Sequence, residues 1–291
     1  MNMKSKSFVE YVLPIFGYIA VIVLVAIVFT VFGEGVPLFR KYSVVKFLTG
    51  NVWRPAASLP KFGSVPLLVS TLIVSGIAMI FAVPLGIATA LYISKLANDT
   101  TKDILKPLTE LLASIPSVVY GFFGIVFVAP LVQKILRLPV GQTGFTAGII
   151  LAFMSLPTIA SISEDAITSV PYELELASFG LGASKFETLI HVVIPAAMPG
   201  IITAISLGFG RAIGETMTVL MVAGGALGMP RSIFSPMRPI TATIAAEMGE
   251  TPVGSLHYHA LFALAAELFI IVVLFNIVAE YYHKKFSAKA G

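Results

Sequence analysis

The chain has 291 residues, of which 57% are hydrophobic and only 12% are charged. Soluble domains carry about 25% charged residues, and disordered chains combine low hydrophobicity with high net charge, so both classes are excluded. The absence of cysteine excludes disulfides, thiolate catalysis and cysteine-based metal sites. A net charge of +4 suits a protein among lipid headgroups and does not indicate nucleic acid as a partner. We therefore expect a polytopic membrane protein.

Six hydrophobic stretches are long enough to cross a bilayer as helices, which takes about 20 residues. The first follows Lys4 and Lys6 and could imitate a signal peptide, but its apolar run is too long for one and no small-residue cleavage site follows. The sequence therefore predicts an all-α fold with six transmembrane helices, at residues 11–32, 65–94, 108–136, 143–168, 198–222 and 258–281. Long polar connections lie at 33–63 and 223–257.

The six spans place both chain termini on one side of the membrane. The total number of lysines and arginines is the same on the two sides of the membrane, so the positive-inside rule does not decide the orientation.

A polar segment, residues 164–191, separates the fourth and fifth spans. Pro171 ends the preceding helix, and the residues after it predict a short amphipathic helix over 172–188, interrupted at two glycines. Its apolar residues recur at helical spacing and its charged residues are mainly acidic, whereas helices that lie on membranes are usually rich in lysine and arginine. A helix docked in a groove of a soluble partner is the alternative to a membrane-surface helix. The apolar residues are Leu174, Ala177 and Leu181, and the glycines are Gly180 and Gly182.

This segment resembles the cytoplasmic signature loop of ABC importer permeases. The matching pattern is Ala177-Ser178-x-x-x-Gly182, followed by Val192-x-Ile194-Pro195. The family motif begins Glu-Ala-Ala, and Leu176 occupies the position of its glutamate, with two other glutamates close by but out of register. The resemblance implies that the loop couples the chain to an ATPase through Glu173, Glu175, Ala177, Ser178, Gly182 and Pro195.

Three further stretches narrow the resemblance to the PstC-type permease subunits of phosphate-specific ABC importers. They are Leu-Leu-Ala-Ser-Ile-Pro-Ser-Val-Val-Tyr-Gly-Phe at 111–122, Ala-Val-Pro-Leu-Gly at 82–86 and Gly-Arg-Ala-Ile-Gly-Glu-Thr-Met at 210–217. The resemblance implies a type I ABC importer permease fold in the cytoplasmic membrane of a prokaryote, with both termini cytoplasmic. It divides the chain into an N-terminal helix with an external loop (1–62), a permease domain (63–285) and a C-terminal tail (286–291).

The resemblance also implies the partners. They are a second, related permease subunit, an ATP-binding cassette ATPase dimer, an extracytoplasmic phosphate-binding protein and the lipid bilayer. The chain has no Gly-x-x-x-x-Gly-Lys-Ser/Thr loop. We therefore expect no catalytic residue and no cofactor in this chain, with ATP and Mg²⁺ bound by the partner ATPase.

Arg211 and Glu215 are charged residues within the predicted fifth span. Four residues apart on a helix, they would share one face and pair. Charges at membrane depth are costly and mark functional sites by default, and a guanidinium suits a phosphate. The sequence therefore predicts that Arg211 lines the substrate path with Glu215 holding it in place; an ion pair that only clips helices together is the alternative. The resemblance points to the same pair.

Other interpretations stay open. The anion could be molybdate, tungstate or sulfate, or the chain could be a self-sufficient ion-coupled transporter that uses Glu215 or Glu267 as a proton carrier. Glu267 could equally be a buried, hydrogen-bonded acid facing another helix. His257 and His259 read as loop histidines and not as a metal site. Small residues recur every fourth position and predict close approach of another helix, from this chain or from a second permease, at Ser206, Gly210 and Gly214.

Overall fold

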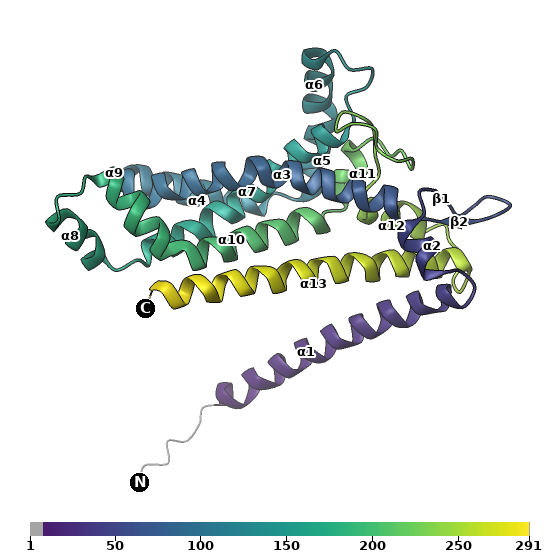
Figure 1. Cartoon of the computed structure of the whole chain (residues 1–291), viewed down its shortest axis with the longest axis horizontal. Coiled ribbons are helices and arrows are strands. Elements are labelled where there is room, and N and C mark those ends of the chain that lie inside the picture. The colour runs from purple at the N-terminus through teal and green to yellow at the C-terminus, as the bar shows by residue number, and fades with distance from the viewer. Residues whose placement is uncertain (1–7, 291) are drawn as a thin grey trace, which may run out of the picture.

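The computed structural model describes residues 8–290, which are almost entirely helical. Three long helices run side by side: α3 (Val65–Leu91), α7 (Gly144–Thr168) and α10 (Ile194–Gly214) (Figure 1). Helix α13 (Leu256–Ala290) packs on α10, and α1 (Phe8–Gly35) meets α13 at one end and diverges from it toward the N-terminus. Lys4 and Lys6, which were predicted to precede the first span, lie outside the described residues.

Shorter elements lie mainly at the two ends of this bundle. One end, called here the loop end, carries α8 (Tyr172–Gly180), between the fourth and fifth spans, and α9 (Lys185–Thr188), with which the fifth span begins. The opposite end, called the hairpin end, carries a small β-hairpin, β1 (Trp53–Arg54) with β2 (Lys61–Phe62). The remaining elements are η1 (Val36–Arg40), α2 (Val44–Thr49), η2 (Tyr92–Leu96), α4 (Asp99–Ser114), α5 (Ser117–Phe123), η3 (Gly124–Val128), α6 (Ala129–Leu136), η4 (Leu189–Val193), α11 (Met217–Val222) and α12 (Ile240–Met248).

The six predicted spans are confirmed as helices long and apolar enough to cross a membrane, among the residues that the structure describes. They are Pro14–Arg40, Val65–Leu96, Ser117–Leu136, Gly144–Thr168, Lys185–Gly214 and Leu256–Phe286. The third span begins nine residues later than predicted, since the expected start was 108. The reason is Pro116, which holds Ile115 in an extended conformation and so separates the amphipathic helix α4 from α5. Helix α13 continues through residues 286–290, the segment predicted to be a tail.

Glycines allow the three central helices to pack closely. Ile159 of α7 lies between Gly86 of α3 and Gly208 of α10. A Cβ atom at Gly86 or Gly208 would come within 2.8 Å or 2.5 Å of the Ile159 side chain, closer than carbon atoms pack. The Ala-Val-Pro-Leu-Gly stretch at 82–86 therefore acts here as a packing element.

The first long connection, predicted as a polar loop, has a hydrophobic core of its own. Trp53 pairs with Phe62 across the hairpin, and their rings meet edge to face. These rings bury themselves against η1, α2 and the start of α3, through Leu38, Phe47 and Leu67. Large apolar residues are interspersed among the polar ones in this connection, and their burial folds the segment.

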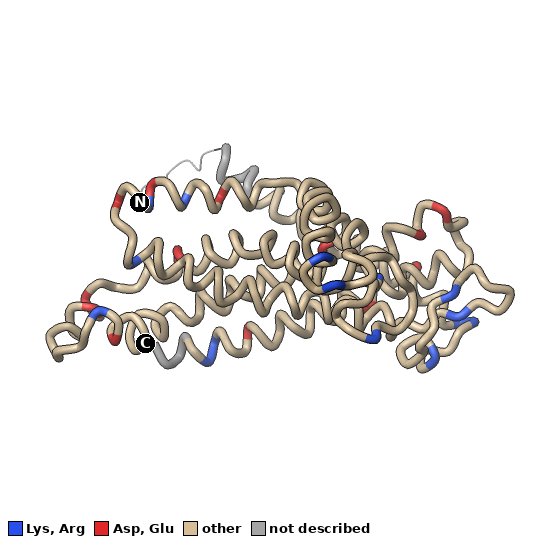
Figure 2. The backbone as a smooth tube through the Cα atoms, turned by 90° about the horizontal axis from the view of Figure 1, so that it is seen from above, with Lys and Arg blue, Asp and Glu red and all other residues tan. Residues whose placement is uncertain are grey.

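Charged residues gather mostly toward the two ends of the bundle, as Figure 2 shows, and the long middle stretch carries few of them. This distribution matches a membrane protein, because charged groups remain in contact with water at the two surfaces. It leaves the charges near the middle as candidates for function.

Candidate functional site

The fifth span ends earlier than predicted, and this changes the geometry of the Arg211–Glu215 pair. Helix α10 ends at Gly214, Glu215 adopts an extended conformation with ψ 131°, and α11 starts only at Met217. A carboxylate oxygen of Glu215 accepts a hydrogen bond from the backbone N–H of Thr218 at 3.1 Å. Its backbone carbonyl accepts another from the Thr241 hydroxyl at 2.6 Å. These bonds satisfy Glu215 outside a helix, so the prediction that it shares a helix face with Arg211 is wrong.

Arg211 instead bonds to two neighbouring elements. Its Nη1 donates to the Thr158 hydroxyl on α7 at 2.9 Å, and its Nη2 donates to the Ala113 carbonyl at the end of α4 at 3.3 Å. Within residues 8–290, Arg211 and Glu215 form no ion pair. The half-buried guanidinium holds α4, α7 and α10 together, and it carries more N–H donors than these two bonds use.

Two of the motif stretches meet around Arg211. The last carbonyls of a helix lack partners within it, and at α4 the Tyr120 hydroxyl donates to Leu112 while Arg211 donates to Ala113. The Thr218 hydroxyl donates to the Ser117 carbonyl at 3.0 Å, which joins α11 to α5. The stretches 111–122 and 210–217 thus form one cluster, called here the Arg211 cluster, although about a hundred residues separate them.

The signature loop forms the predicted short helical segment, with a break at the second glycine. Helix α8 ends at Gly180, and Gly182 has φ +86°, in the region that favours glycine. Across this turn the hydroxyls of Ser178 and Thr188 lie 2.8 Å apart and are buried, which joins α8 to α9. Ser184 and Glu187 form a reciprocal capping box at the start of α9. Pro195 lies where η4 passes into α10, so the motif ends at the start of that helix.

The two glutamates of α8 differ in their surroundings. Glu173 is exposed, whereas Glu175 is buried and its carboxylate lies 2.5 Å from the Lys95 ammonium in η2, which continues α3. Glu175 therefore faces the bundle and Glu173 faces outward. Large apolar side chains are exposed on the same loop, namely Tyr172, Leu174, Leu176, Phe179, Leu181 and Phe186. The apolar face that the sequence predicted, including Ala177, is thus uncovered in this chain.

A lysine on α4 makes a second ionic link to the bundle at the loop end. Lys106 donates to Glu164 at 2.7 Å and to Asp165 at 3.2 Å, both on α7. The hydrogen bond to buried Glu164 is the main reason that the pKa of Lys106 is raised above its usual value. Sequence reasoning passed over Lys95, Lys106 and Glu164, because lysines near a membrane surface are common and nothing local indicates their partners.

A half-buried carboxylate at the hairpin end was also missed. Glu247 of α12 accepts from the Trp53 indole at 3.0 Å and from Arg238 at 3.2 Å, and it lies 2.9 Å from the His257 ring. His257 thus takes part in a structural network, but it lies with His259 in the first turn of α13, so the prediction that these are loop histidines is wrong. His259 lies 2.7 Å from the backbone carbonyl of Glu34.

The small residues of α10 do not all pack against other helices of this chain. A Cβ atom at Gly210 or Gly214 would meet nothing within 4 Å, in contrast to one at Gly208. Ser206 faces α13, alongside Asn276 and Ala279. The predicted close approach of another helix at Gly210 and Gly214 therefore does not come from within residues 8–290.

These features define a multi-pass membrane permease with the fold of type I ABC importers. The chain belongs to the family of binding-protein-dependent transport system inner membrane components, whose family model matches residues 82–289.

Individual relatives are similar over most of the chain. A protein described as a probable ABC transporter permease, YqgH of Bacillus subtilis, is 37% identical and aligns with 84% of this chain and 79% of its own length. The phosphate transport system permease proteins PstC of Mesorhizobium japonicum and Haemophilus influenzae are 36% and 33% identical. They align with 84% of this chain and with 80% and 82% of their own lengths.

Solved structures share the fold at lower sequence identity. A bacterial ABC transporter involved in the import of alginate superposes with a TM-score of 0.60 at 16% identity, over 95% of this chain and 98% of the other. The inward-facing MetNI methionine ABC transporter gives 0.57 at 20% identity, over 77% and 94%.

Proposed function

We propose that this chain is the permease subunit of an ATP-driven importer that moves inorganic phosphate across the cytoplasmic membrane of a prokaryote. The main support is its similarity to phosphate transport system permease proteins over 84% of the chain. Those relatives favour phosphate over molybdate, tungstate or sulfate. Membership of a binding-protein-dependent family argues against a self-sufficient ion-coupled transporter.

Arg211 is the residue that we assign to the phosphate path. Its guanidinium is half-buried at the junction of α4, α7 and α10, and its remaining N–H donors are available to an oxyanion. An anion that draws Arg211 away from the Ala113 carbonyl would also release the end of α4. Binding of phosphate and movement of α4 would then be linked through one side chain, so the conformation of the site would depend on whether phosphate is bound.

The exposed loop formed by α8 and α9 is the surface that we assign to the ATPase. It carries uncovered apolar side chains around a glycine turn, as expected of a short helical segment that inserts in a groove of another protein. Glu173, Ala177 and Leu176 would contact the ATPase, while Glu175 holds α8 to the bundle and Ser178 joins α8 to α9. ATP and Mg²⁺ would bind only to the partner, and this chain would supply no catalytic residue.

A second, related permease subunit would complete the path. Gly210 and Gly214 leave one face of α10 open next to Arg211, and small residues let another helix approach closely. A phosphate-binding protein would deliver the anion at the hairpin end, where the 223–257 connection lies. The loop end would then face the cytoplasm, with both chain termini.

The orientation can be tested by cysteine labelling, because the chain has no cysteine of its own. Leu181 is 90% exposed at the tip of the loop, which makes Leu181→Cys a better probe than Ser184→Cys, since Ser184 caps α9. A membrane-impermeant maleimide should label Leu181→Cys in inverted vesicles and not in intact cells. Ready labelling of Leu181→Cys in intact cells would show that the loop end faces away from the cytoplasm and would contradict the proposed topology.

Transport is tested with the whole complex in proteoliposomes. Labelled phosphate should enter only with ATP on the ATPase side and the binding protein on the other, and excess sulfate or molybdate should compete poorly. Uptake of sulfate or molybdate in preference to phosphate would assign a different anion. Uptake by this permease without an ATPase would contradict the proposed energy source.

A further inference from the structure

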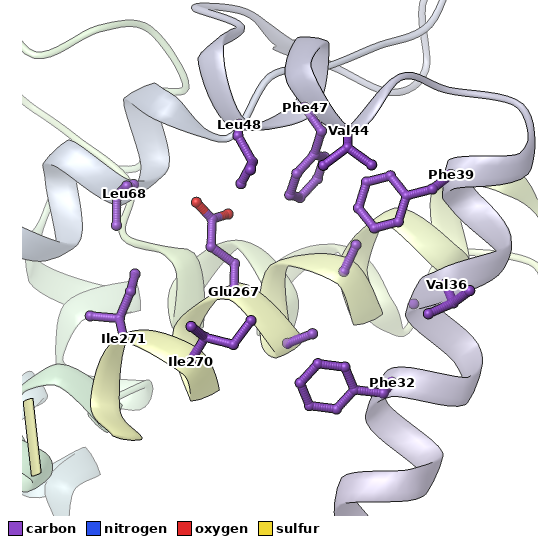
Figure 3. Close-up of a pocket in the computed structure, with 13 residues that line it drawn as sticks. Phe32, Val36, Phe39, Val44, Phe47, Leu48, Leu68, Glu267, Ile270 and Ile271 are labelled. Carbon is purple, nitrogen blue, oxygen red and sulfur yellow. The ribbon is translucent and has the colours of Figure 1, made fainter. Parts of the chain in front are cut away.

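A groove at the hairpin end, called here the Glu267 groove, lies between α1 and α13. Its volume is about 390 Å³, within the range of small-molecule sites, which is roughly 300–1,000 Å³. Its walls come from the end of α1, η1, α2, the start of α3 and α13, and every lining residue but one is apolar. Figure 3 shows the phenyl rings of Phe32, Phe39 and Phe47 around it.

The exception is Glu267, whose side chain turns into the groove. Only 9% of the residue is exposed, and Figure 3 shows its carboxyl directed toward Leu48 and Leu68. One carboxyl oxygen lies 3.1 Å from the Ser64 hydroxyl. The other, Oε2, has no hydrogen-bond partner among residues 8–290. A buried carboxyl oxygen without a partner is costly, so the groove contains an unsatisfied acceptor.

The Ser64 hydroxyl has one proton and two acceptors at 3.1 Å, a carboxyl oxygen of Glu267 and the Phe47 carbonyl. The Phe47 carbonyl also accepts the backbone N–H of Ser64 at 2.9 Å. When Ser64 donates to an ionised Glu267, it satisfies one carboxyl oxygen. Oε2 is buried in the wall of the groove, and it can accept from an occupant of the groove once the carboxyl turns.

The two helices that flank the groove present apolar surface around it. The apolar side chains along α1 are exposed from Ile15 to Phe29, and α13 exposes Phe269, Ile270 and Leu274, so both helices present hydrocarbon to the bilayer. A groove between them would be open to lipid, because hydrocarbon and not water surrounds such surfaces in a bilayer. The groove also lies close to a membrane surface, since the span of α1 ends at Arg40 and that of α3 begins at Val65.

We propose that the Glu267 groove binds a phospholipid whose headgroup carries a primary ammonium, such as phosphatidylethanolamine. Its acyl chain would occupy the apolar walls, and its ammonium would donate an N–H to Oε2 of Glu267 in a charge-assisted hydrogen bond. Arg40 of η1 and Lys46 of α2 are exposed on two of the segments that line the groove, which suits the lipid phosphate. Phosphatidylcholine has a quaternary ammonium without an N–H, and phosphatidylglycerol has no cation, so neither satisfies the carboxyl in this way.

The test is lipid retention by the full-length permease in its complex, measured by native mass spectrometry after nanodisc reconstitution with equal amounts of the three phospholipids. Wild type should retain phosphatidylethanolamine over phosphatidylcholine by about tenfold, the equivalent of one charge-assisted hydrogen bond. Glu267→Gln should lose this preference. Glu280→Gln is the matched control on the same helix, because Glu280 is exposed and far from the groove, and it should keep the preference.

Two further measurements keep the test independent of how Glu267→Gln folds. Val44→Trp fills the groove from an exposed position on its wall and should reduce retention of every lipid without changing the carboxyl. In the wild type, phosphatidylethanolamine with a photoreactive acyl chain should cross-link to peptides containing Phe32 or Ile270. The proposal would be overturned if wild type retained the three lipids equally, or if the preference survived in Glu267→Gln. It would also be overturned if the photoreactive lipid cross-linked to the partner permease and not to the peptides that line the groove.

Discussion

The Lys95 ammonium and the Glu175 carboxylate, 80 residues apart in the sequence, form a mostly buried ion pair at 2.5 Å. The pair ties α8 of the signature loop to η2, which continues α3. Helix α3 packs along α7, which carries Thr158 of the Arg211 cluster. A push on α8 by an ATPase would therefore reach the central helices through this pair as well as through the peptide chain. In the proposed function, Glu175 would position α8 for coupling instead of contacting the ATPase.

Breaking this pair should uncouple ATP hydrolysis from transport. Lys95→Met leaves Glu175 buried without a partner, so phosphate uptake should fall severalfold more than ATP hydrolysis does. The ratio of phosphate imported to ATP hydrolysed, measured in proteoliposomes, reports the coupling. The exchange Lys95→Glu with Glu175→Lys should recover part of that ratio, and Glu173→Gln, on the exposed side of α8, is the control. An unchanged ratio in Lys95→Met would show that the pair carries no coupling.

Phosphate uptake should require the guanidinium of Arg211, and not only a positive charge at this position. Arg211→Lys keeps the charge but loses the planar fork that bonds to Thr158 and Ala113 together, so uptake should fall by about tenfold or more. Arg211→Leu should abolish it. The exposed Arg231→Leu is the matched control for loss of one positive charge. If Arg211→Leu imports phosphate at the wild-type rate, the Arg211 cluster only holds helices together.

Glu215 should tolerate glutamine better than alanine, because its side chain caps α11 through the Thr218 N–H. Glutamine keeps a carbonyl oxygen for that bond, so Glu215→Gln should keep near wild-type stability. Glu215→Ala should lose about 1 kcal/mol of unfolding free energy, a usual value for a lost helix cap. Thermal unfolding of the two variants in detergent measures the difference. Strong destabilisation by Glu215→Gln alone would indicate that the negative charge itself is required.

Replacing Gly182 should act through backbone conformation alone. A Cβ atom there would meet nothing within 4 Å, but the φ of +86° disfavours branched side chains. Gly182→Val should therefore distort the turn and lower phosphate uptake relative to ATP hydrolysis. Gly182→Asn should be milder, because asparagine adopts positive φ more readily. Gly180→Ala is the control, since Gly180 has equally open surroundings in ordinary helical conformation. Equal activity of the valine and asparagine variants would contradict this explanation.

The pKa of Lys106 should change more when Glu164 is replaced than when Asp165 is replaced. The hydrogen bond to Glu164 is the largest cause of the raised pKa of Lys106, and Glu164 is buried while Asp165 is exposed. A raised lysine pKa stabilises the folded chain at any pH below the ordinary value of 10.5, and this contribution disappears as the pH rises through the raised pKa. Glu164→Gln should lower the pKa of Lys106 more than Asp165→Asn does. The pH dependence of amine labelling at Lys106 measures both, and the reverse order would assign the link to Asp165.

The sequence alone was enough to predict the six spans and the short helical loop between the fourth and fifth. Hydropathy adds up along a contiguous stretch, and the turn at Gly182 follows from local backbone preference. Membership of the permease family was also predictable, because its motifs are contiguous in the chain. The start of the third span was misjudged, although Pro116 was visible in the sequence as a signal for the break.

Only the tertiary structure decided which side chains meet. Spacing of four residues suggested that Arg211 pairs with Glu215, but α10 ends at Gly214 because Thr218 and Thr241 satisfy Glu215 outside the helix. The partners of Arg211, Thr158 and Ala113, come from two other helices. Local patterns follow from propensity and hydropathy, whereas contacts of this kind depend on where helices end and how distant segments converge, and those are properties of the packed bundle.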